Sequence, residues 1–155
     1  MIENKIIIGL ITDEDYTRQV LPFVKEEFFS TPQHKLLYKL SMKYFEKYNS
    51  VPQPQVVAIE LNEVTNVDQS TIDNALQLLN VEVEPINEQW LLDETEKFCQ
   101  DKAIYNAIQS NNLDGLLWLE KLRKFISFHN RNLKRISRLR FKEHSEAHLH
   151  WLREI

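Results

Sequence analysis

Glycine is scarce in this chain, and its scarcity limits the folds that the chain can adopt. Only Gly9 and Gly115 occur among 155 residues, whereas average usage would supply roughly 11 glycines. Tight hairpin turns between strands rely on glycine because it adopts positive φ angles without strain. A loop that cradles nucleotide phosphates needs several glycines as well. The sequence therefore argues against sheets joined by tight turns and against a phosphate-binding loop.

The best-defined predicted helix lies between Phe28 and Pro52. Thr31 can cap its first turn, and Pro32 occupies the first helical position, where a missing N–H costs nothing. Residues 49–52 should end the helix, because the residue before a proline is pushed out of the α region. The predicted core-facing stripe consists of Leu37, Leu40, Tyr44 and Tyr48, flanked by Leu36 and Phe45. Lysines recur on another face, which we expect to be solvated: Lys35, Lys39, Lys43 and Lys47.

Helical patterns also cover most of the remaining sequence. Further helices are expected at residues 2–12, 13–24, 52–64, 70–80 and 88–108. Asp13 can cap the second of these helices. Phe28 and Phe29, in the connection that follows it, should be buried at an edge of the core. Only residues 80–84 alternate in polarity, and they are too few to anchor a sheet. The sequence predicts an all-α protein with a helical-bundle domain at 1–86, a helical hairpin at 87–128 and a basic, histidine-rich tail at 129–155.

The charge of the chain is unevenly distributed. Residues 1–110 hold 9 Lys and Arg against 18 Asp and Glu, whereas residues 111–155 hold 10 against 5. A basic end of this kind favours a polyanionic or acidic partner. The single cysteine excludes an internal disulfide and fits a reducing compartment. No apolar run approaches the ~20 residues that span a bilayer, so we expect a cytoplasmic protein without a membrane partner.

No residues in the sequence form a recognisable catalytic constellation. His144 and His148 have a spacing that can hold zinc, but a third ligand is not evident. Cys99 belongs to an apolar helix stripe without a nearby histidine, so it is predicted to be a small buried hydrophobe. We therefore expect no catalytic residue, no metal ligand and no cofactor.

The longest helical pattern, residues 88–108, carries large apolar side chains at heptad spacing. Leu91, Phe98 and Tyr105 lie seven residues apart, and the stripe is widened by Trp90, Ile104 and Ile108. Such a helix either packs against a partner helix or closes the core of its own domain, and the period alone does not choose between them. If a partner is involved, the expected protein interface is Trp90, Leu91, Phe98 and Tyr105.

A second candidate surface is basic. From Lys121 to Lys142 the chain has nine basic residues and no acidic one. Arg131, Lys134, Arg135 and Arg138 fall within two helical turns and could neutralise phosphates of a nucleic acid. The alternative is a solvated helix face that is positive by chance.

The order of these elements resembles a known family. Ile7-Ile8-Gly9-Leu10, Asp15-Tyr16 and the run from Phe28 to Tyr38 resemble the N-terminal domain of DnaB-type replicative helicases. The stretch from Trp90 to Phe98, continuing over residues 103–107, is more narrowly similar to the T-even-like phage branch. The resemblance covers roughly residues 5–108. The motifs that carry it are structural rather than catalytic.

The resemblance implies a function that depends on association rather than chemistry. In that family the N-terminal domain is an all-α bundle followed by a helical hairpin, and its copies form a collar on the helicase hexamer. The collar supports assembly and contacts primase and the helicase loader, while the ATPase motor is a separate C-terminal domain. We expect this chain to be such a collar domain, inactive as an ATPase on its own, and diverged or truncated after about residue 109. The alternative is a stand-alone nucleic-acid-binding or regulatory protein that uses residues 121–142.

Overall fold

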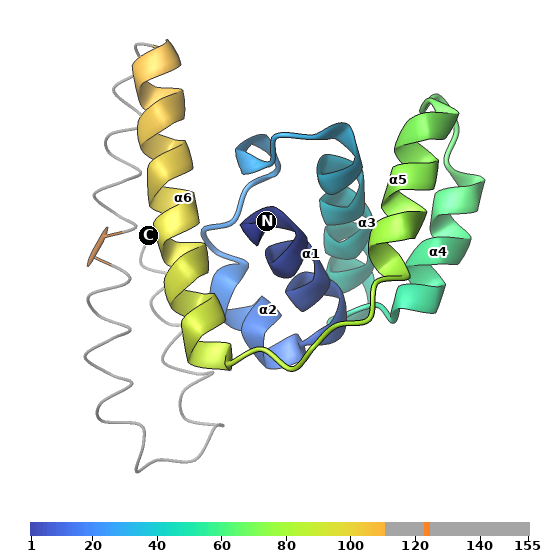
Figure 1. Cartoon of the computed structure of the whole chain (residues 1–155), viewed down its shortest axis with the longest axis horizontal. Coiled ribbons are helices and arrows are strands. Elements are labelled where there is room, and N and C mark those ends of the chain that lie inside the picture. The colour runs from blue at the N-terminus through green and yellow to red at the C-terminus, as the bar shows by residue number, and fades with distance from the viewer. Residues whose placement is uncertain (111–122, 125–155) are drawn as a thin grey trace. The chain divides into compact units, whose positions relative to one another are not determined.

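The computed structural model describes residues 1–110 and 123–124 of the chain, and these residues are helical without any strand. The helices are α1 (Ile2–Thr12), α2 (Glu14–Val20), α3 (Pro32–Tyr48), α4 (Pro54–Glu63), α5 (Gln69–Leu79) and α6 (Glu88–Ser110), with a short 3-10 helix η1 (Glu26–Phe28) (Figure 1). The all-α prediction is confirmed. The chain divides into two compact units, residues 1–99 and 100–155.

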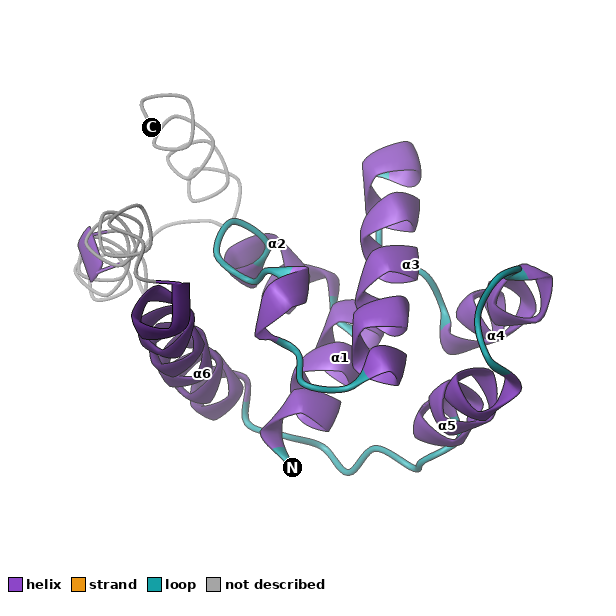
Figure 2. Cartoon of the chain, turned by 90° about the horizontal axis from the view of Figure 1, so that it is seen from above, coloured by secondary structure: helices purple, strands orange, loops and turns teal. Residues whose placement is uncertain are grey.

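Helix α1 forms the centre of the first unit. Its side chains Ile6, Ile7, Leu10 and Ile11 are all buried, and the helix packs against α2 and α3 (Figure 2). Helices α4 and α5 contact each other and both contact α3. Helix α3 therefore connects the central helix α1 to the α4–α5 pair.

Capping residues mark the beginnings of three helices. The Asp13 carboxylate accepts a hydrogen bond from the Tyr16 N–H at 3.0 Å, and the Thr31 hydroxyl oxygen accepts one from the His34 N–H at 3.5 Å. Asp68 caps α5 through the Thr71 N–H at 3.0 Å. Each cap satisfies a backbone donor that the helix itself leaves unpaired. The predicted caps Asp13 and Thr31 are confirmed.

Helix α3 ends within the predicted residues, but for a different reason. Its C-cap residue Asn49 has a left-handed backbone with φ 53°, a conformation that asparagine tolerates and that often terminates helices. Arg18 fixes this turn by donating to the Asn49 carbonyl oxygen at 2.7 Å and to its side-chain oxygen at 3.2 Å. The helix therefore ends at Tyr48, four residues before Pro52, without requiring the proline.

The buried face of α3 is partly different from the predicted stripe. Leu37, Leu40 and Phe45 are buried as expected, but Tyr48 is 53% exposed, so its predicted core position was wrong. The Tyr44 and Tyr48 rings instead lie against each other, with centroids 4.5 Å apart. The inner face also includes two polar residues, His34 and Ser41. Because these two polar residues are buried, the inner face of α3 differs from the face predicted from the apolar residues alone.

A buried polar cluster joins the first turns of α1 and α3. Glu3 is 5% exposed and His34 is 2% exposed, and the Glu3 carboxylate accepts hydrogen bonds from the Ser30 N–H at 3.1 Å and the Ser30 hydroxyl at 2.8 Å. His34 Nε2 lies 2.6 Å from Asn4 Oδ1, and Nδ1 lies within hydrogen-bonding distance of the Thr31 hydroxyl and 3.3 Å from Glu3. These partners offset the cost of burying polar groups.

Candidate protein-interaction surfaces

The first half of α6 is part of the core of the first unit. Leu91, Thr95, Phe98 and Cys99 are all buried. The Phe98 ring packs on the Phe29 ring with a centroid distance of 5.8 Å, and the Tyr16 hydroxyl lies 2.7 Å from Thr95 Oγ1. For residues 88–99, the structure therefore favours the hypothesis that this helix closes its own core.

The four residues of the predicted interface divide into two pairs. Leu91 and Phe98 are only 6% and 7% exposed, whereas Trp90 and Tyr105 are 43% and 60% exposed. Heptad spacing identified an apolar stripe correctly, but it does not specify what covers that stripe. Only Trp90 and Tyr105 present enough surface to meet a partner without unfolding the helix.

The second half of α6 has one buried and one exposed side. The small residues Ala103 and Ala107 are buried, whereas Ile104, Tyr105 and Ile108 are 46%, 60% and 74% exposed. We refer to these three exposed residues as the α6 patch. Ile108 lies four positions after Ile104 and three after Tyr105, so it adjoins both of them on one side of the helix. Three large apolar side chains grouped on a solvent-facing helix surface are typical of an association site.

The predicted basic surface cannot be placed in the structure. Arg131, Lys134, Arg135 and Arg138 lie outside the described residues, as do His144 and His148. Nucleic-acid binding by these residues stays a prediction.

Chemistry at Cys99 is disfavoured by its surroundings. The side chain is fully buried, and burial raises the pKa of its thiol because a thiolate would lose its hydration. This agrees with the predicted role as a small hydrophobe. Among residues 1–110 and 123–124, no three His, Cys, Asp or Glu side chains are arranged to hold a metal ion. Within the same residues, no helix is long and apolar enough to cross a membrane.

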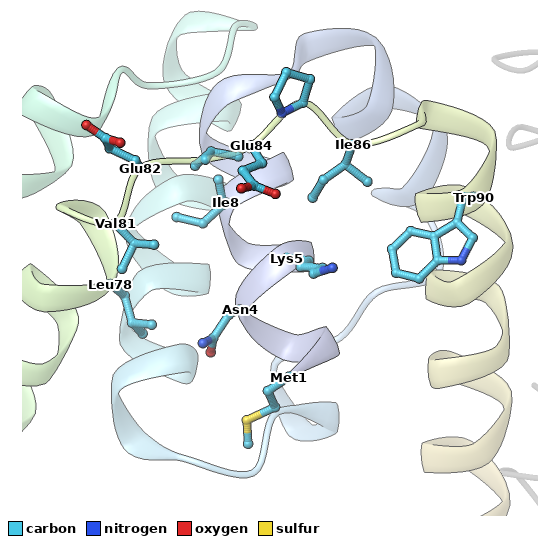
Figure 3. A pocket seen from close by; sticks show the side chains of 12 residues that line it. Met1, Asn4, Lys5, Ile8, Leu78, Val81, Glu82, Glu84, Ile86 and Trp90 are labelled. Carbon is cyan, nitrogen blue, oxygen red and sulfur yellow. The ribbon is translucent and has the colours of Figure 1, made fainter.

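A groove lies along one side of α1 and was not identified from the sequence. It has a volume of about 590 Å³ and is lined by Met1, Asn4, Lys5, Ile8, Leu78, Val81, Glu82, Val83, Glu84, Pro85, Ile86 and Trp90. We call it the α1 groove. Figure 3 shows α1 as its base, with the α5–α6 connection along one margin and Trp90 at one end. The groove combines residues 1–8 with residues 78–90, which are distant in sequence, so no local motif indicated it.

Comparisons with known proteins agree with this architecture. The family model of the DnaB-like helicase N terminal domain matches residues 1–88. A DnaB-like replicative helicase of Enterobacteria phage T4 is 32% identical over 104 residues, which make up 66% of this chain and 22% of that protein. The matched part therefore spans about a fifth of the length of the T4 protein. The chain belongs to the DnaB-like helicase N-terminal domain family, and the resemblance predicted from its sequence is confirmed.

Proposed function

We propose that this chain acts as the assembly domain of a phage replicative DNA helicase, in the cytoplasm of the host cell. Its family membership and all-helical architecture support this role. The sequence contains no glycine-rich P-loop, so ATP hydrolysis and unwinding would require a separate motor domain. In this proposal the chain contributes surfaces for association, as a dimer or a higher oligomer such as the hexamer expected for the family.

The α6 patch is the observation that best supports self-association. Ile104, Tyr105 and Ile108 expose large apolar side chains to water, although burying such side chains is worth about 1.5–3 kcal/mol each. Pairing the α6 patches of two copies would remove this surface from water. Trp90, from the predicted interface, is a second exposed aromatic residue that could contribute to assembly.

Contacts with primase and with the helicase loader are the second component of the proposal. They are expected from the resemblance to the DnaB-type family. The strongly acidic character of residues 1–110 would favour partners with basic surfaces.

Light scattering coupled to size-exclusion chromatography tests self-association directly. The full chain should elute with a mass above that of the monomer, and the mass should increase with protein concentration. Tyr105→Ser combined with Ile108→Ser should shift the population towards the monomer. Ile59→Ser is a matched control, because Ile59 is 61% exposed on a different helix, α4.

Two results would contradict the proposal. A wild-type chain that remains monomeric at every concentration would exclude self-association by the isolated chain. Sustained ATP hydrolysis by the pure protein in the presence of forked DNA would show that it is an enzyme in its own right.

A further inference from the structure

The connection between α5 and α6 leaves its polar backbone groups available. Residues 82–87 form neither helix nor strand as they pass α1 (Figure 3). Within the described part of the chain, no backbone hydrogen bond involves residues 81–86. Backbone N–H and C=O groups pair whenever they are buried, so a ligand that covers this connection must supply hydrogen-bonding partners. An extended peptide backbone can do so.

Side chains of the same connection alternate between apolar and acidic. Val81 and Val83 are 59% and 51% exposed. Glu82 follows Val81, and Glu84 follows Val83. Neither glutamate makes an ion pair or a hydrogen bond with another residue of the described chain. Ile8, Leu78 and Trp90 add further apolar surface to the groove. The α1 groove thus combines apolar contacts with two unneutralised carboxylates.

The charged side chains that line the α1 groove are Glu82, Glu84 and Lys5. Glu82 and Glu84 belong to a stretch, residues 48–96, that contains no Lys or Arg and ten acidic residues. Lys5 is the only basic residue in the lining of the groove, and its Nζ atom lies 4.8 Å from the centre of the Trp90 ring. Cationic side chains of a ligand would therefore be attracted to the Glu82 and Glu84 side of the groove.

From these observations we propose that the α1 groove binds an extended segment of a partner protein in which apolar residues alternate with Lys or Arg. The apolar side chains of the segment pack against Ile8, Val83 and Trp90. Its basic side chains pair with Glu82 and Glu84, and its backbone pairs with the α5–α6 connection. This site is distinct from the α6 patch, so it does not depend on the self-association proposed above.

A fluorescein-labelled peptide of alternating lysine and valine is the probe for this site. Its binding to the full chain is measured by fluorescence anisotropy, alongside two control peptides. In one control the valines are replaced by serine, and in the other the lysines are replaced by glutamate. We expect both controls to bind at least about tenfold more weakly, because each loses one of the two kinds of contact. Equal binding of the serine peptide would overturn the proposal, because charge alone would then account for the affinity.

Matched charge reversals locate the binding site. Glu82→Lys with Glu84→Lys should weaken binding of the lysine–valine peptide at least about tenfold. Glu60→Lys with Glu63→Lys changes the net charge equally, on α4 and outside the groove, and should leave the affinity within about twofold. An equal effect of the two pairs would overturn the proposal, because binding would then follow net charge rather than the groove.

A pair of substitutions at exposed valines tests the contribution of apolar contacts to peptide binding. Val81→Ser with Val83→Ser should weaken peptide binding, whereas the exposed Ile59→Ser change on α4 should not. Circular dichroism and light scattering on the same samples report whether folding and self-association are unchanged. Failure of the wild-type chain to bind the lysine–valine peptide at all would overturn the proposal. That result would leave self-association through the α6 patch intact.

Discussion

The Tyr16 hydroxyl donates a hydrogen bond to Thr95 Oγ1, joining two fully buried residues of α2 and α6 across 2.7 Å. The direction of this bond follows from the second contact of Thr95, whose hydroxyl proton is donated to the Leu91 carbonyl oxygen at 2.6 Å. Burial raises the pKa of the Tyr16 phenol, so this group stays protonated. The contact fixes the first half of α6 to the core of residues 1–99.

Removal of either hydroxyl should destabilise the domain, but to different extents. Tyr16→Phe removes the donor and leaves Thr95 bonded to Leu91, so we expect a loss of about 1 kcal/mol. Thr95→Val leaves the buried Tyr16 hydroxyl without its acceptor, so the loss should be larger, about 1–3 kcal/mol. The measurement is the free energy of unfolding from urea titrations.

The double variant, Tyr16→Phe with Thr95→Val, controls for effects of each substitution alone. It should be less destabilised than the sum of the two single variants, because no polar group is then left unpaired. Additive losses would show that the two hydroxyls do not interact.

Gly9→Ala should lower stability despite the higher helix propensity of alanine. A Cβ atom at Gly9 would lie 2.6 Å from Tyr16 Cε1 and 3.3 Å from Leu91 Cδ2, so both neighbours would have to move. Overpacking of this kind costs about 1–3 kcal/mol, more than the ~1 kcal/mol gained in helix propensity. Asn74→Ala, at an exposed position of α5, is the control and should be neutral or slightly stabilising. A Gly9→Ala protein as stable as wild type by thermal unfolding would contradict the close packing of α1, α2 and α6.

Acidification should destabilise the first unit through His34. Burial lowers the pKa of this imidazole, while the charge of Glu3 partly opposes the shift. The unfolded chain therefore binds the proton more readily than the folded chain does. The contribution of His34 is complete above the unfolded pKa of about 6.5 and is lost as the pH falls from there towards the folded pKa.

The pH dependence of His34→Gln identifies the residue responsible. The free energy of unfolding of the wild-type chain should fall between about pH 7 and about pH 5. The His34→Gln protein should be less stable at neutral pH but should lose less stability over the same interval. An identical decline in both proteins would assign the acid sensitivity to other groups.

Substitution by alanine should affect stability at Phe98 and assembly at Tyr105. Phe98→Ala removes a buried ring that packs on Phe29, so it should cost about 3–5 kcal/mol of unfolding free energy. Tyr105→Ala changes an exposed side chain and should alter stability by no more than about 0.5 kcal/mol. In light scattering, Tyr105→Ala should nevertheless reduce the mass of the assembly. Equal stability losses would contradict the different burial of the two residues.

The basic segment gives a prediction for DNA binding. If Arg131, Lys134, Arg135 and Arg138 contact phosphates, replacing all four with glutamine should reduce the salt slope of log K for duplex DNA by up to about 3.6. Glutamine at Lys35, Lys39, Lys43 and Lys47 of α3 is a control with the same change in charge. Equal effects of the two sets, measured by anisotropy with labelled duplex at several salt concentrations, would exclude a specific role for the basic segment.

Local chemistry made much of this fold predictable. Thr31 and Pro32 indicated the first turn of α3, Asp13 indicated that of α2, and the buried positions of Phe28 and Phe29 were correctly expected. Each of these features depends on residues close together in sequence. Scarcity of glycine and the spacing of apolar residues were sufficient to predict an all-α protein.

Features that depend on distant segments were not predictable. Tyr48 has the spacing of a core residue, but it is exposed, and among the described residues no distant segment covers it. Periodicity placed Leu91 and Phe98 on one stripe with Tyr105, but it did not indicate that the core of residues 1–99 buries the first two. The α1 groove combines α1, the α5–α6 connection and Trp90.

The polar cluster beneath the first turn of α1 has a consequence for how the helices align. Apolar side chains such as Ile6 and Ile7 would tolerate a small axial slide of α1 along α3, because hydrophobic contact has no preferred direction. Glu3 and Asn4 tolerate none, since their partners Ser30 and His34 are fixed at the start of α3. A helix displaced by one residue would separate the buried Glu3 carboxylate from the Ser30 donors and His34 Nε2 from Asn4. The cluster thus selects a single register for α1, which the apolar core alone does not specify.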